Sequence, residues 1–127
     1  MLPEYAEGLR DLEGFERLWL IYRLHKASPG PLRVIPFRDT TERGVFATRA
    51  PCRPNAIGLS CVRLLSVAGN VLTIGGVDIL DGTPLLDIKP YVPAFDAFPN
   101  SRAGWLDDSD ERRHADDRFG GSSDRKT

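Results

Sequence analysis

The sequence predicts a mainly all-β domain: a small antiparallel β-barrel with one short N-terminal helix and a disordered C-terminal tail. Short apolar segments follow one another at close spacing, and glycine and proline separate them. The last 21 residues carry 12 charges and a single aromatic side chain, too little apolar surface to offset the entropy of ordering. We therefore expect a folded domain at residues 1–106 and a solvated, disordered tail at residues 107–127.

The first predicted element is a short helix at residues 5–12. Leu9 and Leu12 are spaced to share one helical face, and Gly14 is a typical terminator. Phe15, which follows, is expected to fill part of the core.

A strand is predicted next, at residues 18–25, which are few and rich in aromatic and branched side chains. Strand alternation places four of its side chains on one face, namely Leu18, Leu20, Tyr22 and Leu24. The sequence Ser-Pro-Gly-Pro at residues 28–31 then predicts a loop. Two further short strands are expected at residues 33–37 and 45–48.

The second half of the domain predicts more strands joined by tight turns. Residues 60–67 and 71–74 flank Ala-Gly-Asn and predict a hairpin. The two glycines at 75–76 are typical of a bulge or a sharp bend. Residues 77–80 predict another strand and Asp81-Gly82 a turn. Residues 85–88 then predict a buried strand, and the prolines at 90 and 93 require an extended segment without central pairing.

Charge and composition exclude several classes of protein. The net charge is −1, but residues 33–63 hold six arginines against two acidic residues, so a confined basic patch is the only polyanion site expected. No apolar run is long enough for a membrane helix. Cys52 and Cys61 form no metal-type cluster, and we expect no metal. Two thiols and no leader sequence predict a cytoplasmic protein.

The most informative segment is residues 48–60, here called the proline arm. Pro51 and Pro54 keep it out of helix, so Arg49 and Arg53 project from a stiff, extended backbone. Asn55 and Gly58 follow; the glycine allows a close backbone approach or a positive φ. This pattern is typical of a ligand-binding rim on a β scaffold. The alternative is a stiff loop whose arginines are only solvated or hold the arm itself.

A second group of polar residues lies around the predicted turn at Asp81-Gly82. Asp78 stands among apolar neighbours and needs a cationic or polar partner, such as an arginine of the proline arm or a positively charged ligand. Asp81 is a candidate ligand group or a cap of its own turn. His25 at a strand end is either a rim residue or a structural histidine. Asp87 and Lys89 are expected to pair with each other.

Several of these residues also form blocks that resemble a known family. Residues 44–49 (Gly-Val-Phe-Ala-Thr-Arg), 53–55 (Arg-Pro-Asn) and 57–60 (Ile-Gly-Leu-Ser) resemble the signature of the TsaA-like, or TrmO, family of tRNA methyltransferases. Residues 81–84 and 87–93 are similar to its second block. The resemblance extends over residues 5–96. It implies a small antiparallel β-barrel, usually dimeric, that binds S-adenosylmethionine without a Rossmann sheet.

The resemblance also implies an activity and a set of site residues. The activity is methylation of N6 of threonylcarbamoyladenosine at tRNA position 37, with the anticodon-loop region as partner and a homodimer as the assembly. The implied cofactor contacts are His25, Lys26, Arg49, Leu59, Asp78, Ile79, Leu80 and Asp81. We expect Arg53 and Asn55 to contact the substrate, and we assign no catalytic residue.

This chain departs from the family pattern at its start. Family members place a strand and a Pro-Arg-Gln motif before the region where this chain opens, so we expect weakened cofactor binding. The alternative function is a non-catalytic barrel that binds the cofactor or RNA. A purely structural dimer module is a third hypothesis.

Overall fold

The computed structural model describes residues 1–107. Met1–Tyr91 form one compact unit, and the chain from Val92 on belongs to a second. The predicted tail, residues 107–127, lies outside the described residues except for Asp107. Within residues 1–107, no helix is long and apolar enough to cross a membrane.

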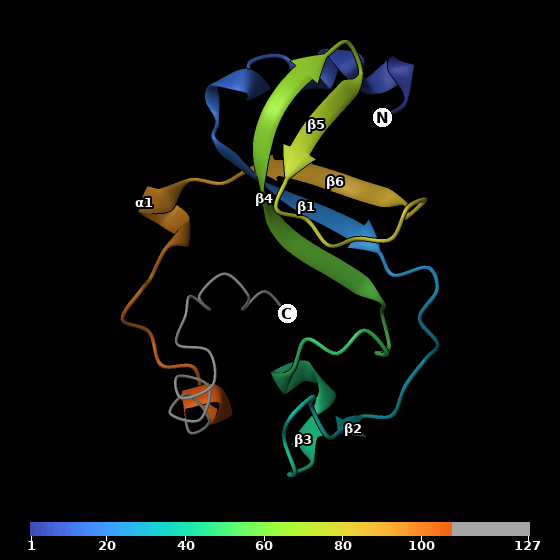
Figure 1. Ribbon diagram of the computed structural model, residues 1–127, viewed down its shortest axis with the longest axis vertical. Helices are drawn as coiled ribbons and strands as arrows, with labels where there is room; N and C mark the ends of the chain where they lie inside the picture. Colours follow the sequence, from blue (N-terminus) through green and yellow to red (C-terminus); the bar gives the residue numbers. More distant parts are fainter. Residues whose placement is uncertain (108–127) are drawn as a thin grey trace. The chain divides into compact units, whose positions relative to one another are not determined.

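The first unit contains a four-stranded antiparallel sheet (Figure 1). Its strands are β1 (Arg17–Arg23), β4 (Ile57–Ala68), β5 (Val71–Gly75) and β6 (Leu85–Pro90), in the order β5-β4-β1-β6. The domain is mostly β, as predicted, but the expectation of a closed barrel is wrong. β5 and β6 occupy opposite edges and do not pair, so the sheet stays open.

Three expected strands differ from the structure. Residues 45–48 form the 3-10 helix η3 (Val45–Ala47), because both the backbone N–H and the hydroxyl of Thr48 donate to the carbonyl of Val45. Residues 33–37 contribute only β2 (Arg33–Val34), since a turn in which the Asp39 N–H donates to the Pro36 carbonyl follows it. Residues 77–80 form part of a loop that leaves β5 at Gly76, where φ is +73°.

The predicted N-terminal helix is two short 3-10 helices, η1 (Pro3–Leu9) and η2 (Leu12–Gly14). Asp11, with φ of +70°, separates them. Leu9, the last residue of η1, and Leu12, the first residue of η2, are both buried in the core cluster, as expected. Phe15 is not a core residue, since it is 37% exposed.

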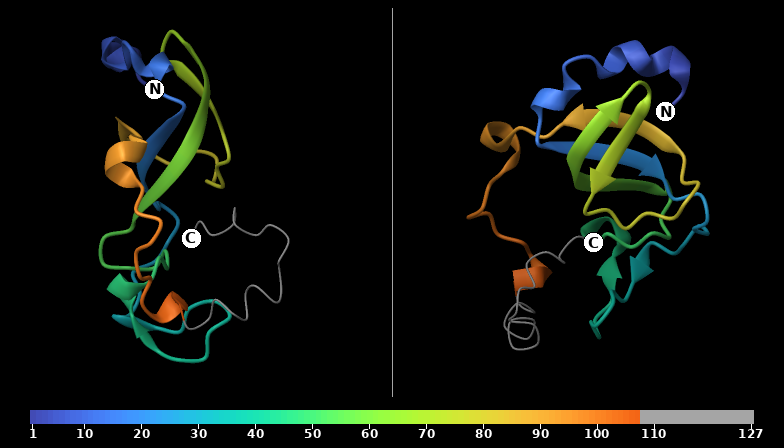
Figure 2. Two further views of the ribbon diagram at one scale, coloured as in Figure 1. Left: turned by 90° about the vertical axis from the view of Figure 1, so that its left-hand side faces the viewer. Right: turned by 45° about the horizontal axis from the view of Figure 1, so that its top comes forward.

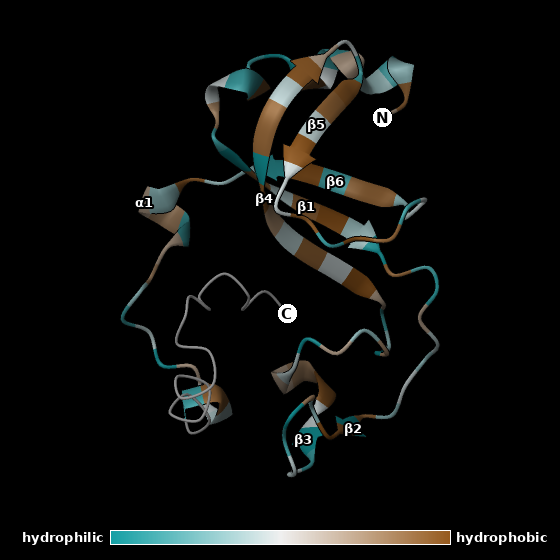
Figure 3. Cartoon of the chain, in the orientation of Figure 1, coloured by the Kyte–Doolittle hydropathy of each residue, from teal (hydrophilic) through white to brown (hydrophobic). Residues whose placement is uncertain are grey.

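The core lies on one face of the sheet, and its strand alternation is the predicted one. Leu18, Leu20 and Tyr22 of β1 are buried, and Val62 of β4 lies opposite Leu18. Together with Leu9 and Leu12 they form a single cluster. Figure 3 shows the hydrophobic bands along β1, β4, β5 and β6 that this alternation produces.

The hairpin predicted after residue 60 is confirmed. β4 and β5 pair up to Ala68 and Val71, and Gly69 takes φ of +63° in the two-residue turn. The register shifts between Leu64 and Ser66, so that Leu65 is an extra residue in β4. Val67 rather than Ser66 then packs against the core.

β6 is an edge strand, and the expectation that residues 85–88 are buried is wrong. Leu85 and Leu86 are 42% and 53% exposed. Pro90 is tolerated in β6 because an edge strand does not need every ladder donor. In the second unit, α1 (Pro93–Asp96) is a single turn in which the carboxylate of Asp96 accepts a hydrogen bond from the backbone N–H of Val92.

Gly58 of β4 lies directly opposite Tyr22 of β1, and the ring of Tyr22 occupies the space beside it. A Cβ added at Gly58 would clash with Cε2 of Tyr22. The hydroxyl of Tyr22 is 2.7 Å from the Oγ of Ser60, which holds the ring in this place. The close approach expected at Gly58 is therefore to Tyr22.

β2 and β3 (Arg43–Gly44) form a separate two-stranded sheet around a loop that contains Asp39. The carboxylate of Asp39 accepts bonds from the N–H groups of Thr40 and Thr41 and from Nε of Arg43, at 2.7, 3.2 and 3.0 Å. The bond from Arg43 is the main reason that the pKa of Asp39 lies below its usual 3.8.

We predict that Gly58→Ala destabilises the domain by about 1–3 kcal/mol, because the new methyl group must displace the Tyr22 ring. Urea denaturation measures the change. Gly8→Ala is the matched control, since nothing lies within 4 Å of a Cβ at that position. An unchanged midpoint for Gly58→Ala would contradict the packing described.

We predict that the stabilisation from Asp39 is complete above pH 3.8 and is lost as the pH falls through the lowered pKa of the folded state. NMR titration of the Thr40 and Thr41 amides should give a midpoint below 3.8. Arg43→Ala should raise that midpoint, whereas Arg33→Ala, which removes the partner of Glu42, should leave it unchanged. Equal midpoints in wild type and Arg43→Ala would refute the assignment.

Candidate functional site

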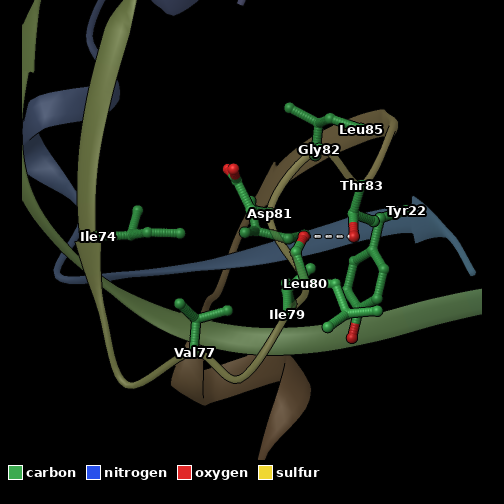
Figure 4. A pocket seen from close by; sticks show the side chains of 10 residues that line it. Tyr22, Ile74, Val77, Ile79, Leu80, Asp81, Gly82, Thr83 and Leu85 are labelled. Carbon is green, nitrogen blue, oxygen red and sulfur yellow. Dashed lines mark hydrogen bonds between the residues drawn. The ribbon is translucent and has the colours of Figure 1, made fainter.

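A pocket of about 320 Å³ lies between the core face of the sheet and the loop of residues 76–84 (Figure 4). This loop joins β5 to β6, which are at opposite edges of the sheet, so it must cross two strands. Three strand spacings amount to about 14 Å, a span that nine residues cover easily. The lining residues are Leu20, Tyr22, Ile74, Val77, Ile79, Leu80, Asp81, Gly82, Thr83 and Leu85.

The loop is held by its own turn and by β1. The hydroxyl and the N–H of Thr83 both donate to the carbonyl of Leu80, at 2.6 and 3.2 Å. Gly82 takes φ of +83°, the left-handed conformation that such a turn requires, and the predicted turn at Asp81-Gly82 is confirmed. The N–H of Arg23 donates to the carbonyl of Pro84 and fixes the end of the loop to β1.

The chemical character of the pocket is apolar with few polar groups. Aliphatic side chains form most of the pocket wall, and the aromatic ring of Tyr22 forms another part of it. The hydroxyl of Tyr22 is already bonded to Ser60. The carboxylate of Asp81 is exposed, and Figure 4 shows it directed away from the Tyr22 ring. Such a site suits a flat or apolar group that also carries a hydrogen-bond donor or a positive charge.

Three of the predicted cofactor residues, Ile79, Leu80 and Asp81, line this pocket. Asp78 belongs to the same loop but is exposed, and it does not stand inside a strand as expected. Because water solvates its carboxylate, Asp78 needs no arginine partner, and it forms no ion pair with a described residue.

The other predicted cofactor residues lie outside the pocket lining. His25 is half-buried and Lys26 exposed, just beyond the end of β1. Leu59 pairs with Ile21, so its side chain is on the sheet face opposite Tyr22 and is 55% exposed. Arg49 is exposed in the proline arm. Of the predicted cofactor residues, the pocket lining therefore includes only three, all of them in the loop at residues 76–84.

The two arginines of the proline arm differ. One nitrogen of the Arg53 guanidinium, Nη1, donates to the carbonyls of Thr48 and Ala50, both at 2.9 Å, so Arg53 holds the arm in shape. Arg49 has no hydrogen bond or ion pair with any described residue. Asn55, the other expected substrate residue, has an exposed side chain. Its backbone carbonyl accepts a hydrogen bond from the backbone N–H of Ile57.

Sequence reasoning missed Tyr22 and Thr83 as pocket residues. Alternation along β1 predicts that Tyr22 faces the core, but its second role depends on a loop that crosses the sheet. The sequence carries no clear signal for that crossing. Among residues 1–107, no group of three or more histidine, cysteine or acidic side chains could hold a metal ion.

We predict that Arg53→Ala and Arg49→Ala have different effects on the arm. A hydrogen bond from a charged donor contributes about 1.5–3 kcal/mol, so Arg53→Ala should accelerate hydrogen exchange at the N–H groups of Thr48 and Ala50 by roughly ten-fold or more. Arg49→Ala is the matched control and should leave these rates unchanged. Equal exchange rates in the two variants would show that Arg53 does not order the arm.

Comparison with known proteins places these features in a family. Residues 1–97 match the family described as tRNA-methyltransferase O N-terminal domain. A probable S-adenosyl-L-methionine-binding protein of Pyrococcus abyssi is 57% identical over 107 residues, which are 84% of this chain and 58% of that protein. The tRNA (adenine(37)-N6)-methyltransferase of Escherichia coli is 40% identical over 108 residues, which are 79% of this chain and 46% of the enzyme.

Solved structures agree with the sequence matches. The crystal structure of TrmO from Pseudomonas aeruginosa superimposes with a TM-score of 0.67 at 44% sequence identity, over 82% of this chain and 45% of that one. This chain therefore spans roughly half the length of the Pseudomonas and Escherichia proteins. Because the family match covers most of the described residues and the folds superimpose, the chain belongs to the tRNA-methyltransferase O family, through its N-terminal domain.

Proposed function

We propose that this chain is the cofactor-binding domain of an S-adenosylmethionine-dependent methyltransferase that acts on N6 of adenine 37 in tRNA. The observation that carries the proposal is the family match over residues 1–97, together with a formed pocket at residues 79–81. Relatives are named as S-adenosyl-L-methionine-binding proteins and as tRNA (adenine(37)-N6)-methyltransferases.

The pocket fits the chemistry of the proposed cofactor. Its aliphatic wall and the Tyr22 ring suit an adenine ring, and the exposed carboxylate of Asp81 suits ribose hydroxyls or a positive charge. A volume of about 320 Å³ is at the lower end of the range for small-molecule sites. We propose that His25, Lys26, Arg49 and Asp78 are further cofactor contacts, and that Leu59, whose side chain lies on the other face of the sheet, contributes through its backbone.

In this proposal the domain acts by binding and orientation. S-adenosylmethionine supplies a methyl group activated by a sulfonium centre. The fixed loop of residues 76–84 and the wall of the pocket exclude water from one side of the bound molecule. Holding donor and acceptor in line supplies much of the rate enhancement. The acceptor nitrogen must also lose a proton, which a nearby base would take.

We propose further that the acceptor is threonylcarbamoyladenosine in the anticodon loop, and that the protein is a cytoplasmic homodimer. The sheet face opposite the core supports association, since Ile57 and Leu59 expose about half of their surfaces there and Leu59 lies opposite Ile21. A reducing compartment fits two cysteines that form no disulfide, Cys52 and Cys61.

Titration calorimetry with S-adenosylmethionine tests the binding step. We predict saturable binding that Asp81→Asn weakens about ten-fold, because it loses a charged acceptor but keeps the shape of the side chain. Asp87→Asn is the matched control, since Asp87 pairs with Lys89 on β6 and does not line the pocket. Binding heat equal to buffer, or equal affinity for both variants, would reject the site.

Mass spectrometry of nucleosides tests the reaction. Incubation with tRNA that carries threonylcarbamoyladenosine should give the N6-methyl product, and tRNA without that group should not. Methylation of both tRNAs would support the methyltransferase activity but reject threonylcarbamoyladenosine as the required acceptor. Binding of cofactor and tRNA without a methylated product would favour the adaptor hypothesis, and sedimentation equilibrium on the same sample tests the homodimer.

A further inference from the structure

Residues 32–53, here called the stacking segment, expose two phenylalanine rings to solvent. Phe37 is 89% exposed and Phe46 is 74% exposed, and neither belongs to the hydrophobic core. Apolar and polar residues follow each other closely along this segment, around β2 and β3 (Figure 3). An exposed aromatic ring presents a flat apolar surface, and a ligand that covers this surface removes it from water, which is favourable.

Each of the two rings lies beside an arginine. Cζ of Arg38 is 5.5 Å from the ring centroid of Phe37, and Cζ of Arg53 is 6.0 Å from that of Phe46. A guanidinium over one face restrains the ring, and the high exposure leaves the rest of the ring accessible. Arg53 is itself fixed, because Nη1 donates to the carbonyls of Thr48 and Ala50.

The charge of the stacking segment is strongly positive. It contains five arginines and two acidic residues. Asp39 is bonded to Arg43 at 3.0 Å, and Glu42 lies 3.6 Å from Arg33, so both acidic residues already have arginine partners. Neither Arg49 nor Arg53 has an acidic partner among residues 1–107.

We infer that the stacking segment binds unpaired RNA bases, with Phe37 and Phe46 as stacking surfaces and the arginines beside them as phosphate contacts. Single-stranded nucleic acid is recognised by this combination of aromatic rings and positive charge, whereas a paired helix hides the faces of its bases. The excess of arginine favours a polyanion over a protein partner. The inference rests on the proposed function only for the identity of the natural RNA, a tRNA loop.

The experiment measures RNA binding without cofactor, by fluorescence anisotropy of the whole chain. The probe is a labelled RNA of roughly 12 nucleotides and mixed sequence, offered single-stranded or as a duplex. We expect tighter binding of the single strand. Phe37→Leu and Phe46→Leu keep an apolar side chain but remove the flat ring, and each should weaken single-strand binding by about five-fold or more. Phe37→Trp should preserve the binding.

The matched control is Phe95→Leu, because Phe95 is 71% exposed and no arginine among residues 1–107 lies over its ring. This variant should bind the single strand as the wild type does. Equal affinity for single strand and duplex, or unchanged binding in the folded double variant Phe37→Leu/Phe46→Leu, would overturn the inference. The inference would also be overturned if the protein did not bind RNA and instead self-associated through Phe37 and Phe46. The RNA-binding assay contains no cofactor, so its result does not depend on whether the protein binds S-adenosylmethionine or methylates tRNA. Failure of this inference can therefore be distinguished from failure of the proposed function.

Discussion

The pocket depends on the order of the strands in the sheet. β5 and β6 follow each other in the sequence but lie at opposite edges, so their connection must pass over the sheet (Figure 2). It passes over the core face, where it encloses space above Leu20 and Tyr22. The same order leaves both edges without a partner strand from residues 1–107, which is why the sheet does not close. An open sheet and a covered pocket therefore have one cause.

The β2–β3 hairpin and the proline arm that follows it obtain their shape by a different means. They have few buried apolar side chains, and polar contacts replace packing. Val45 is fully buried, but nearby the backbone is ordered by Thr48, Asp39 and Arg53, each of which bonds to main-chain groups. Such contacts fix a conformation without covering the exposed rings. This allows a rigid segment to keep aromatic surface in water.

Much of the sheet could be predicted from the sequence because alternation and turn chemistry are local. The buried face of β1 and the turns at Gly69 and Gly82 follow directly from residue types. The prediction of a closed barrel was wrong because closure requires the two edge strands to pair. The sequence specifies such pairing only through long-range packing. Residues 77–80 have strand-like composition for another reason: from a loop, Ile79 packs against the core, and Val77 and Leu80 line the pocket although both are exposed.

The candidate site shows the same division. Ile79, Leu80 and Asp81 are consecutive, so a sequence block brings them together automatically. His25, Arg49 and Leu59 are far apart in the chain, and their positions depend on the arm and on the sheet face that each occupies. Arg53 illustrates a further difficulty, since an arginine beside prolines is equally suited to bind a ligand or to bind its own backbone. Only the positions of the Thr48 and Ala50 carbonyls show that Nη1 of Arg53 binds the backbone, a role that does not use the other guanidinium nitrogens.

The contact between Gly58 and Tyr22 also limits how this sequence can vary. The Tyr22 ring fills the volume that any larger residue at position 58 would need, so the two positions share a fixed amount of space. A relative with a side chain at position 58 must carry a smaller residue at position 22 or spread the two strands. Because Tyr22 also forms a wall of the pocket, such a pair of substitutions would enlarge the cavity. Substitution of Gly58 on β4 is therefore linked, through Tyr22, to the size of the ligands that the pocket can bind.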